Sequence, residues 1–497
     1  MSVPGLQLSE LPIGQPFSNF TAQDSTPAEP LAEKTYEIAK LREWRFEVAF
    51  GATVEVKLLK GSAEIFGTEL PIGHKFTFTG TKSAIFTWHG CTLEVRGSPS
   101  VEYTSEETPM TAYTNLHFAL EKQRGMASES PTMQGPRVMI IGPENAGKTS
   151  LVKILTAYAV RQGQKPAVVN LDPKEGVLSL PGTLSATSFS TIMDVEEGFG
   201  SSPTSGPSPV PVKLPLVYYY GLETPEGNTK LYRALVSRMA VAVSSRLSED
   251  DQSTPPPSPP STNEVNTRTP QDRSSGIIID TPGTISQTPT GYDLLHHAIS
   301  EFSVTTLVVL GSERLYSDML RRFEDRPNHQ HHPPISIIKL SKSGGCVDRD
   351  DAFLRASRER SIREYFFGEP KKRTLSPYTM TVGFDDLNIW RVGEASTLNA
   401  SLLPIGHDDD EEGGGGGGGQ ALLAQAECSM LLQHSVAAVL HAEVGDGVHI
   451  LAESSVMGAS VDEQKRYMKI LAPMPGRLPP KPLVVSSFPE PTFSLVG

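Results

Sequence analysis

Cysteine is scarce in this sequence, and the cysteines are far apart in the chain. Cys91, Cys346 and Cys428 are the three thiols of a 497-residue chain. The odd number and the wide spacing exclude a disulfide framework and a cysteine-rich zinc site as organising features. So few thiols in so long a chain are typical of a reducing compartment, such as the cytosol or the nucleus.

Long apolar runs and an excess of positive charge are also missing. No run approaches the roughly 18 apolar residues of a membrane span. The first residues lack the charged and apolar segments of a secretory signal, so we expect a soluble intracellular protein. Lys and Arg number 44 against 57 Asp and Glu, which gives a formal charge of −13. This balance excludes a broad electrostatic grip on nucleic acid, although a local basic patch stays open.

Three stretches have compositions that do not form a packed core. Residues 1–33 are rich in Pro, Ser and Thr and predict a disordered tail. Residues 248–275 contain the run PPPSPPST and predict a disordered insert. In residues 407–420 acidic side chains run into seven glycines, a composition typical of a solvated linker. At about 100–200 residues per domain, the remaining chain forms two to four domains.

Residues 34–110 carry the pattern of an all-β domain. Apolar and polar residues alternate over 44–50, 54–58, 75–79 and 92–96. Glycines punctuate these runs at short intervals, as in a sandwich of about 80 residues. Residues 111–136 then predict a connecting helix followed by a linker.

Residues 137–374 alternate between strand and helix patterns. Short apolar runs predict buried strands at 138–141, 167–171, 276–280, 305–310 and 335–340. Helical patterns cover 229–246 and 291–302. This order predicts an α/β domain with a parallel sheet. Residues 375–497, with strands predicted at 388–392 and 448–451, predict a small mixed C-terminal domain.

The motif that carries chemistry is a P-loop. Residues 142–149 read GPENAGKT, which matches G-x-x-x-x-G-K-[ST], and they stand between an apolar strand and an amphipathic helix. Glycines let backbone N–H groups turn toward phosphate oxygens, and the helix N-terminus adds a positive dipole end. We expect Lys148 to reach the β- and γ-phosphates and the Thr149 hydroxyl to coordinate Mg²⁺.

Two aspartates end predicted strands at the edge where an open α/β sheet binds ligands. Asp172 can hold Mg²⁺ or accept a proton from an attacking hydroxyl, and it can equally be a turn residue before Pro173. Asp280 is a second candidate for the metal or water site, and turn chemistry explains it as well.

A basic segment follows the last predicted strand of the sheet. It contains Arg349, Arg355, Arg358, Arg360 and Arg363. Arginines above a P-loop can form a lid that stabilises charge on the transferring phosphoryl group. A solvated helix with i,i+4 ion pairs explains the pattern equally well, so both interpretations stay open.

By these motifs the chain resembles the Clp family of pre-mRNA cleavage and polyadenylation factors, which are relatives of polynucleotide 5′-hydroxyl kinases. Besides the P-loop, the resemblance rests on blocks at residues 45–48, 63–70, 86–91, 194–199, 215–218 and 362–366. It implies ATP and Mg²⁺ between an N-terminal β-domain and a P-loop domain. By resemblance the nucleotide contacts are Glu43, Lys82, Gly142, Asn145, Ala146, Gly147, Lys148, Thr149 and Ser150. The metal ligands are then Thr149 and Asp172.

The chain departs from the active members of that family at three places. Glu175 stands where active members have Gln, and Thr284 stands where they have a base-stacking Trp. Ser361 replaces a lid arginine, although Arg358 is retained. By resemblance, fungal members of this type bind ATP without turning it over. A carboxylate beside the γ-phosphate opposes the electrostatics that phosphoryl transfer needs.

The resemblance therefore implies an ATP-binding scaffold subunit of the nuclear cleavage and polyadenylation complex. Its partners would be other subunits, including the one that reads the RNA polymerase II tail. The alternative is an active RNA 5′-hydroxyl kinase with Asp172 as base and Arg358 in the lid. A GTPase-like switch is less favoured, because the sequence has no Asn-Lys-x-Asp segment to read guanine.

Overall fold

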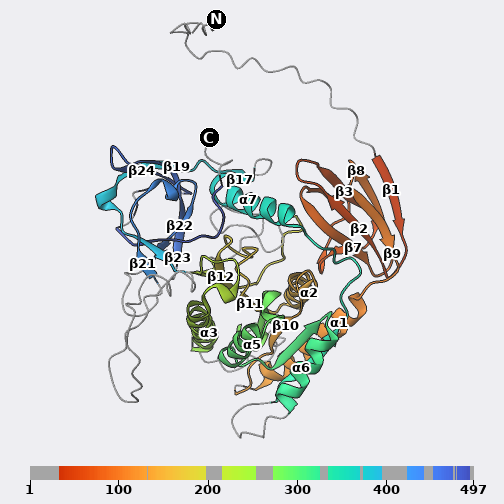
Figure 1. Ribbon diagram of the computed structural model, residues 1–497. Helices are drawn as coiled ribbons and strands as arrows, with labels where there is room; N and C mark the ends of the chain where they lie inside the picture. The colour runs from red at the N-terminus through yellow and green to blue at the C-terminus, as the bar shows by residue number, and fades with distance from the viewer. Residues whose placement is uncertain are drawn as a thin grey trace, which may run out of the picture.

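The computed structural model places three bodies in chain order (Figure 1). It describes residues 33–130, 132–196, 215–252, 272–324, 334–369, 373–393, 423–441, 452–473, 476, 478 and 480–492. The predicted tail lies outside this set except for Glu33, and so does the predicted linker 407–420. Within the described residues, none of the helices has the length and apolar character to cross a membrane.

The N-terminal body is the predicted β-sandwich. One sheet has the order β1 (Glu33–Ile38), β8 (Cys91–Arg96), β3 (Val54–Gly61) and β6 (Lys75–Phe78). The other has the order β5 (Thr68–Glu69), β4 (Glu64–Ile65), β7 (Thr81–Thr87), β2 (Arg42–Val48) and β9 (Val101–Ser105). Alternate side chains such as Trp44, Ile85 and Leu93 are fully buried between the sheets.

Three strands of the sandwich were not predicted: the two-residue β5 and the longer β1 and β9. β1 reads EKTYEI and β9 reads VEYTS, and both lie at a sheet edge. Most of their side chains are exposed, so their sequences carry little of the apolar alternation that marks a half-buried strand. The edge position explains why the sequence pattern gave no signal for them.

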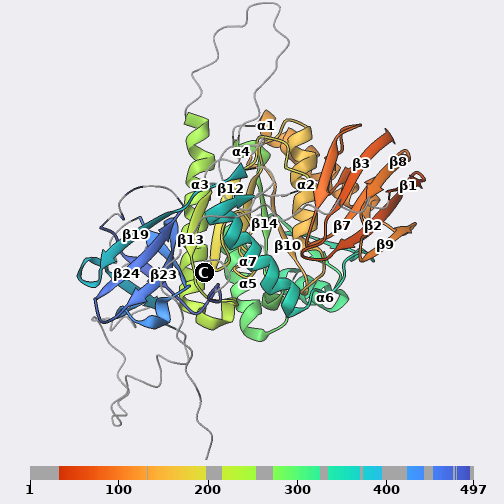
Figure 2. The same ribbon diagram turned by 90° about the horizontal axis from the view of Figure 1, so that it is seen from above.

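Helix α1 (Met110–Glu129) connects the sandwich to the central body and confirms the predicted connecting helix. It packs with α2 (Lys148–Arg161) against one face of the central sheet. At the contact with the sandwich, the buried Tyr158 hydroxyl of α2 donates to the Glu64 carboxylate. Figure 2 shows the sandwich beside α2 on the side of the central sheet opposite to the C-terminal body.

The central sheet has seven strands. Their order is β13 (Leu216–Tyr219), β12 (Thr183–Ser188), β11 (Ala167–Asn170), β14 (Ile277–Asp280), β10 (Arg137–Ile141), β15 (Thr306–Leu310) and β16 (Ser336–Leu340). The five strands from β11 to β16 run parallel, as predicted. β12 and β13 extend the sheet in antiparallel pairing and were not predicted. β12 reads TLSATS, so four of its six buried positions hold Ser or Thr, and no apolar run marks the strand.

Both faces of this sheet are covered by helices. Alternate residues of β10 point to opposite cores: Met139 and Ile141 face α3 (Thr229–Gln252) and α5 (Pro289–Glu301), while Val138 and Ile140 face α1 and α2. The remaining helical elements of this body are η1 (Pro225–Asn228), α4 (Asp272–Ser275), η2 (Thr284–Ser286), α6 (Glu313–Glu324) and α7 (Asp351–Phe367).

The predicted insert 248–275 is shorter at both ends than its composition indicated. Helix α3 continues through Gln252, and α4 begins at Asp272. The stretch 253–271, which holds the proline run, lies outside the described residues. The last turn of α3 reads SEDDQ and has no apolar residue to continue a helical pattern, so the composition placed the boundary too early.

The C-terminal body is built on a seven-stranded sheet. Its order is β19 (Tyr378–Gly383), β24 (Tyr467–Ala472), β23 (Ala452–Asp462), β22 (Val436–Leu440), β25 (Leu483–Val485), β20 (Ile389–Val392) and β21 (Leu423–Gln425). Figure 1 shows this sheet strongly curled. We predicted a small mixed domain, and its described residues form strands with two one-turn helices, η3 (Phe384–Asp386) and η4 (Met430–Leu432). The predicted strand 448–451 lies outside the described residues.

Helix α7 joins the central and C-terminal bodies. Its buried residues Ile362, Tyr365 and Phe366 form a core with Val436 and Met457 of the C-terminal sheet. A two-stranded ribbon, β17 (Gly368–Glu369) and β18 (Arg373–Thr374), follows the helix. Any ligand above the P-loop therefore lies close to an element that is fixed to the C-terminal body.

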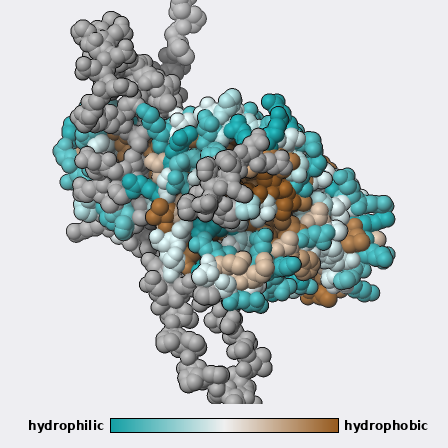
Figure 3. All heavy atoms as spheres, turned by 90° about the horizontal axis from the view of Figure 1, so that it is seen from below, coloured by the Kyte–Doolittle hydropathy of each residue, from teal (hydrophilic) through white to brown (hydrophobic). Residues whose placement is uncertain are grey.

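The described surface keeps some large apolar side chains exposed on each body. Ile72 of the sandwich is 65% exposed, Val241 on α3 is 64% exposed and Leu431 in the C-terminal body is 73% exposed. Figure 3 shows one face on which apolar groups gather beside more polar surface. The three residues named here lie on different bodies and so belong to different surfaces.

Candidate nucleotide-binding site

The glycine-rich loop between β10 and α2 has the backbone that the motif predicts. Asn145 and Gly147 have positive φ angles of 54° and 88°, so the chain turns sharply before α2 begins at Lys148. A side chain at Gly142 would lie 2.5 Å from the carbonyl oxygen of Leu310, so only glycine fits there. The turn places the N-terminus of a 14-residue helix at the end of a buried parallel strand, where anions bind.

A cleft of about 360 Å³ lies above this loop, between the sandwich and the central body. The predicted nucleotide and metal residues that line it are Glu43, Lys82, Asn145, Ala146, Gly147, Lys148, Thr149, Ser150 and Asp172. Gly142 is in the loop but not in the lining. Residues from two bodies, about 100 positions apart in sequence, therefore face one cleft, as the resemblance implied.

The two reactive side chains of the motif have protein partners in this structure. The Lys148 ammonium group donates to the Pro143 carbonyl oxygen at 2.9 Å. The Thr149 hydroxyl donates to Oδ2 of Asp280 at 2.5 Å. Asp280, which the sequence left as a second candidate, is thus the carboxylate in direct contact with Thr149. Asp172 instead accepts from the backbone N–H of Lys174 at 2.9 Å.

Both aspartates sit in surroundings that disfavour their charge. Burial, with the nearby Glu175 carboxylate, raises the pKa of Asp172 to about 7. Burial raises the pKa of Asp280 to about 6, although the hydrogen bond from Thr149 opposes the shift. A cation in the cleft would relieve both carboxylates, since desolvation penalises an unpaired charge.

The residues present fit Mg²⁺ bound together with phosphate oxygens. A threonine hydroxyl and one or two carboxylates are the protein ligands that Mg²⁺ takes at nucleotide sites, and water and phosphate complete its shell. Among the residues that the structure describes, no cluster of three or more His, Cys, Asp and Glu could hold a metal without such help. The donor set thus suits a metal that arrives with a nucleotide.

Glu175, the departure from the active pattern, forms an ion pair over the cleft. The guanidinium of Arg349 donates to both of its oxygens, at 3.0 Å from Nη1 to Oε2 and through a shorter contact to Oε1. Arg349 also donates from Nε to the Asn145 side chain at 3.3 Å. Burial alone would raise the pKa of Glu175, but the Arg349 charge outweighs it and lowers that pKa below its ordinary value.

Arg358 and Arg360 of α7 line a cavity that adjoins the cleft and shares Thr149, Glu175 and Arg349 with it, and both arginines have protein partners. Arg358 is nearly buried and pairs with the Glu490 carboxylate, at 3.1 Å from Nε. Arg360 donates to the Thr79 carbonyl oxygen at 2.6 Å and pairs with Glu364 at 2.7 Å, an i,i+4 pair of the kind that the solvated-helix interpretation predicts.

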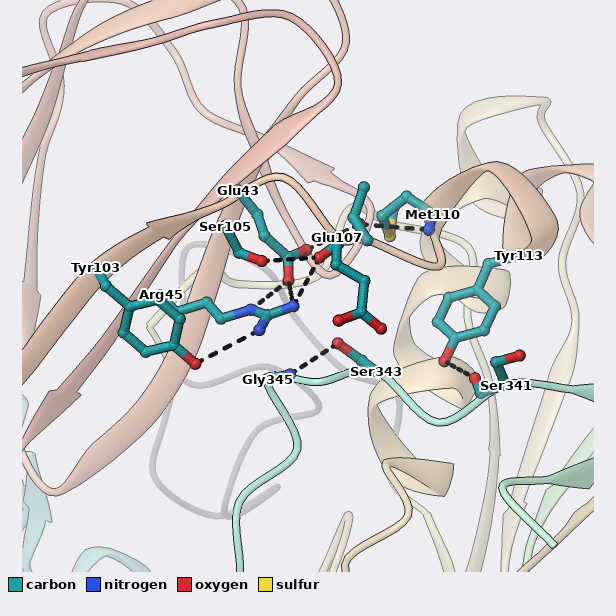
Figure 4. A network of polar contacts seen from close by, with 11 residues as sticks. Glu43, Arg45, Tyr103, Ser105, Glu107, Met110, Tyr113, Ser341, Ser343 and Gly345 are labelled. Atoms are coloured by element: carbon teal, nitrogen blue, oxygen red, sulfur yellow. Dashed lines mark hydrogen bonds and ion pairs between the residues drawn. The ribbon is translucent and has the colours of Figure 1, made fainter.

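The other end of the cleft contains a buried network that sequence reasoning missed (Figure 4). Arg45 Nε donates to Glu43 Oε1 at 2.5 Å, and Arg45 Nη2 donates to the Glu107 carbonyl oxygen at 2.8 Å. Thr108 donates to the second oxygen of Glu43 at 2.9 Å. Gly345 of the loop after β16 packs closely against the guanidinium, since a side chain there would lie 2.8 Å from Nε.

A signal for this network was present in the sequence. Glu43 and Arg45 are two apart on one strand, so they share a face, and opposite charges there can pair. The burial of both groups, each under 10% exposed, could not be read from that spacing. The network holds the carboxylate of Glu43 in place and joins the sandwich to the loop 343–346 of the central body.

Comparison with known proteins covers all three bodies. Residues 37–127 match the model of the N-terminal β-sandwich domain of polyadenylation factor. Residues 142–257 and 261–368 match the mRNA cleavage and polyadenylation factor CLP1 P-loop. Residues 375–490 match the pre-mRNA cleavage complex II protein Clp1.

Full-length relatives and solved structures agree with these matches. The chain is 50% identical over 501 residues to the mRNA cleavage and polyadenylation factor clp1 of Botryotinia fuckeliana, and 43% identical over 503 residues to that of Phaeosphaeria nodorum. Each alignment covers the whole of both chains. A solved structure of a wild-type Clp1p–Pcf11p complex is 29% identical with a TM-score of 0.76, covering 92% of this chain and 98% of that one.

A second solved structure, equally similar, concerns the interface between Pcf11p and Clp1p and the structural basis of ATP loss in a point mutant. The three family models together span most of the described residues, and the relatives match from end to end. The chain belongs to the Clp1 family of mRNA cleavage and polyadenylation factors, of the fungal type.

Proposed function

We propose that this protein is an ATP-binding scaffold subunit of the nuclear pre-mRNA cleavage and polyadenylation complex, and that it does not transfer the γ-phosphoryl group. MgATP would occupy the cleft, with Glu43 and Lys82 at the sandwich side and Asn145, Ala146 and Gly147 to Ser150 around the phosphates. The metal would lie at Thr149 and the strand-end carboxylates. The names of the full-length relatives support the assignment to this complex.

The observation that carries the absence of transfer is the pairing of the lid arginines with the chain's own carboxylates. Arg349 is held by Glu175, Arg358 by Glu490 and Arg360 by Glu364. An arginine acting on a transferring phosphoryl group can be worth on the order of 10³–10⁵ in rate. A guanidinium already neutralised by a carboxylate supplies little of that stabilisation.

An unreacted nucleotide suits a scaffold role. The cleft is formed by two bodies, so a ligand bound across it stabilises their docked arrangement and not the separated one. Retained ATP would fasten the sandwich to the central body and fix the surface that a partner meets. Hydrolysis would weaken that fastening, which makes slow or absent turnover consistent with the role.

The nucleotide content of the purified protein tests this proposal. Protein prepared without added nucleotide is denatured, and the released nucleotide is identified by chromatography. We expect ATP at close to one equivalent and little ADP. Recovery of ADP alone, together with steady phosphate release from added ATP, would contradict the proposal.

One observation favours the alternative, an active RNA 5′-hydroxyl kinase. Asp172 has a pKa of about 7 at the edge of the cleft, which suits a general base that accepts a hydroxyl proton. Transfer of labelled γ-phosphate to a 5′-hydroxyl oligonucleotide, and its loss in Lys148→Ala, would establish this function. We expect no transfer above the level of the Lys148→Ala control.

The partners are proposed from the similar structures. Both contain Clp1p together with Pcf11p or concern their interface. We therefore propose that this chain binds the corresponding cleavage-factor subunit, the one that also reads the RNA polymerase II tail, and that it acts in the nucleus. Co-purification of that subunit with the tagged chain from nuclear extract tests the assignment, and its absence from the purified complex would contradict it.

A further inference from the structure

We propose that the first turn of α7 closes the nucleotide cleft against the sandwich, and that the ring contact between Phe50 and Phe353 is its latch. Opening of this latch sets the rate at which the bound nucleotide leaves. Phe353 is also a positioning residue for Lys82, the proposed nucleotide contact on β7. The inference rests on the proposed ATP binding and deepens it, because it names what retains the nucleotide in the cleft.

Helix α7 spans the distance between two bodies. Figure 1 shows it between the C-terminal body and the sandwich. Its second half is fixed to the C-terminal body through the core that contains Ile362, Tyr365 and Phe366. Its first turn is closed by an N-cap, since the Asp350 carboxylate accepts from the Phe353 backbone N–H at 2.8 Å. The far end of the helix is therefore anchored, and the near end is an ordered turn beside the cleft.

The side chains of this first turn point in two directions. Asp351 and Leu354 line the nucleotide cleft. Neighbouring helix residues point about 100° apart, so Phe353 is directed elsewhere. Its ring meets the Phe50 ring of the sandwich, with the two centroids 5.1 Å apart. Because Lys82 of the sandwich lines the same cleft, the ring contact joins two of its walls.

The sandwich provides a seat for the Phe50 ring. Phe50 lies in the turn after β2, and Gly80 lies in the turn before β7. The Gly80 backbone N–H donates to the Ala49 carbonyl oxygen at 3.3 Å, which joins the two turns. A side chain at Gly80 would lie 2.4 Å from Cε1 of the Phe50 ring, so glycine is required there. Phe50 is still 36% exposed, so the contact can open without unpacking the core of the sandwich.

The Phe353 ring also holds Lys82 in place. The Lys82 ammonium group lies 5.2 Å from the centroid of that ring, within the range in which a cation is attracted to an aromatic face. The same group pairs with Glu47 at 3.2 Å and donates to the Asp348 carbonyl oxygen at 3.4 Å. Asp348 belongs to the loop that leads into α7. Closure of the first turn and placement of Lys82 are therefore one event.

A second contact fixes α7 to the same turn of the sandwich. The Arg360 guanidinium donates to the Thr79 carbonyl oxygen at 2.6 Å. Arg360 follows Phe353 by seven residues, or two turns, so both side chains lie on one face of the helix. Loss of the ring contact leaves this second contact in place. Removing the latch should therefore loosen the first turn and speed nucleotide release without abolishing binding, as lid opening does where it limits release.

Release of a fluorescent ATP analogue from the full chain, chased with unlabelled ATP in a stopped-flow instrument, tests the latch. We expect Phe50→Ala and Phe353→Ala each to speed release about three- to tenfold, the size of effect that one ring contact gives, with little change in the association rate. The double variant should release no faster than either single variant, because each removes the same contact. Phe118→Ala, at a 58% exposed ring on α1, is the matched control and should release at the parent rate.

A conservative substitution tests the positioning of Lys82. Phe353→Leu keeps an apolar side chain beside Phe50 and removes the aromatic face from the ammonium group. We expect it to weaken ATP affinity about two- to threefold in the parent and to change nothing in a Lys82→Met background, because its effect passes through Lys82. Equal weakening in both backgrounds would overturn the positioning role.

Release at the parent rate by both Phe50→Ala and Phe353→Ala would overturn the latch. If Phe353→Ala fails to fold, which its thermal unfolding midpoint would reveal, Phe50→Ala decides the question, since it removes the same contact from the sandwich side. A parent protein that binds no nucleotide defeats the proposed function, and this inference with it. Nucleotide binding with a release rate that ignores both rings overturns this inference alone.

Discussion

Each end of the cleft contains an ion pair, and the two pairs differ in exposure. At the sandwich end, the Glu43 and Arg45 side chains are 5% and 8% exposed, and further hydrogen bonds satisfy both groups. At the phosphate end, the Glu175 and Arg349 side chains are 29% and 30% exposed. A buried pair is fixed because separating it leaves a charge without water, whereas a half-exposed pair can exchange partners. We infer that the sandwich end of the cleft, which we call the base end because the nucleobase would lie there, is preformed. The end at the P-loop, the phosphate end, is adjustable.

Breaking the buried Glu43–Arg45 pair should have the largest effect on the free energy of unfolding. Arg45→Met leaves the Glu43 carboxylate buried without its partner, which typically costs about 3–5 kcal/mol of unfolding free energy. Urea denaturation of the nucleotide-free protein measures it. The matched control is Lys34→Met at the exposed pair with Glu102, where solvent screens the charges and the loss should be much smaller. Equal losses at the two sites would contradict a fixed base end.

The second prediction concerns pH and the Asp172 carboxyl. Its pKa is raised to about 7 in the folded protein, mainly by burial, so the native state holds a proton that the unfolded chain has released. Stability of the nucleotide-free protein should therefore fall as pH rises from about 4 to 7 and level off above that. Asp172→Asn cannot ionise and should be more stable than the parent by up to a few kcal/mol near pH 8.

Unfolding free energies of both proteins at about pH 5 and pH 8 check this prediction. The advantage of Asp172→Asn should be larger at the higher pH. Asp385→Asn, at an exposed carboxylate of the C-terminal body, serves as the control and should give no such difference between the two pH values. An advantage that shrinks as pH rises would show that the sign is wrong.

The parts of the molecule differ in how far their sequence predicts them. The glycine-rich loop, its strand and its helix are consecutive in the chain, so their geometry follows from local pattern. The sandwich was predictable because its buried faces repeat with a period of two, and the five parallel strands because they are short apolar runs. The edge strands β1 and β9 were not, because most of their side chains are exposed and carry no apolar alternation. The polar strand β12 was not, because the burial of its residues depends on neighbours distant in sequence.

The partners of the cleft's charged residues were beyond sequence reasoning. Glu175 and Arg349 are 174 positions apart, and Arg358 and Glu490 are 132 apart. The departure at Glu175 was visible as a residue type, but the guanidinium that neutralises it was not. Asp280 was a candidate on its strand end, and its contact with Thr149 needed the order of strands in the sheet.

The third prediction tests the adjustable end. Glu175→Gln removes the negative charge that opposes the terminal phosphate and releases the charge of Arg349 toward the nucleotide. ATP should bind about three- to tenfold tighter, and ADP should change less because it lacks the γ-phosphate. Fluorescent nucleotide titrations give both constants. Glu313→Gln, which breaks the exposed pair with Lys339, should leave them unchanged. Weaker ATP binding by Glu175→Gln would contradict an adjustable end.

The smallest effect is expected at Glu490, where the C-terminal segment meets α7. Its carboxylate is 39% exposed and pairs with Arg358, which lies 5.3 Å from the Phe488 ring. Partial burial would raise the pKa of Glu490, but the hydrogen bond from Arg358 outweighs it and lowers that pKa, so the pair contributes stability above about pH 4.5 that is lost as pH falls further. Glu490→Gln should cost at most about 1 kcal/mol at neutral pH, because solvent screens the pair.

The Glu490→Gln variant distinguishes two possible roles of the Arg358–Glu490 pair. If it merely fastens α7 to the C-terminal segment, Glu490→Gln should lower stability slightly and leave phosphoryl transfer at the background of Lys148→Ala. If Glu490 instead withholds Arg358 from a competent site, transfer to a 5′-hydroxyl oligonucleotide should rise above that background once the carboxylate is neutralised. We expect the first result, because Glu175 still occupies Arg349, and transfer should need both guanidinium groups at the phosphate end.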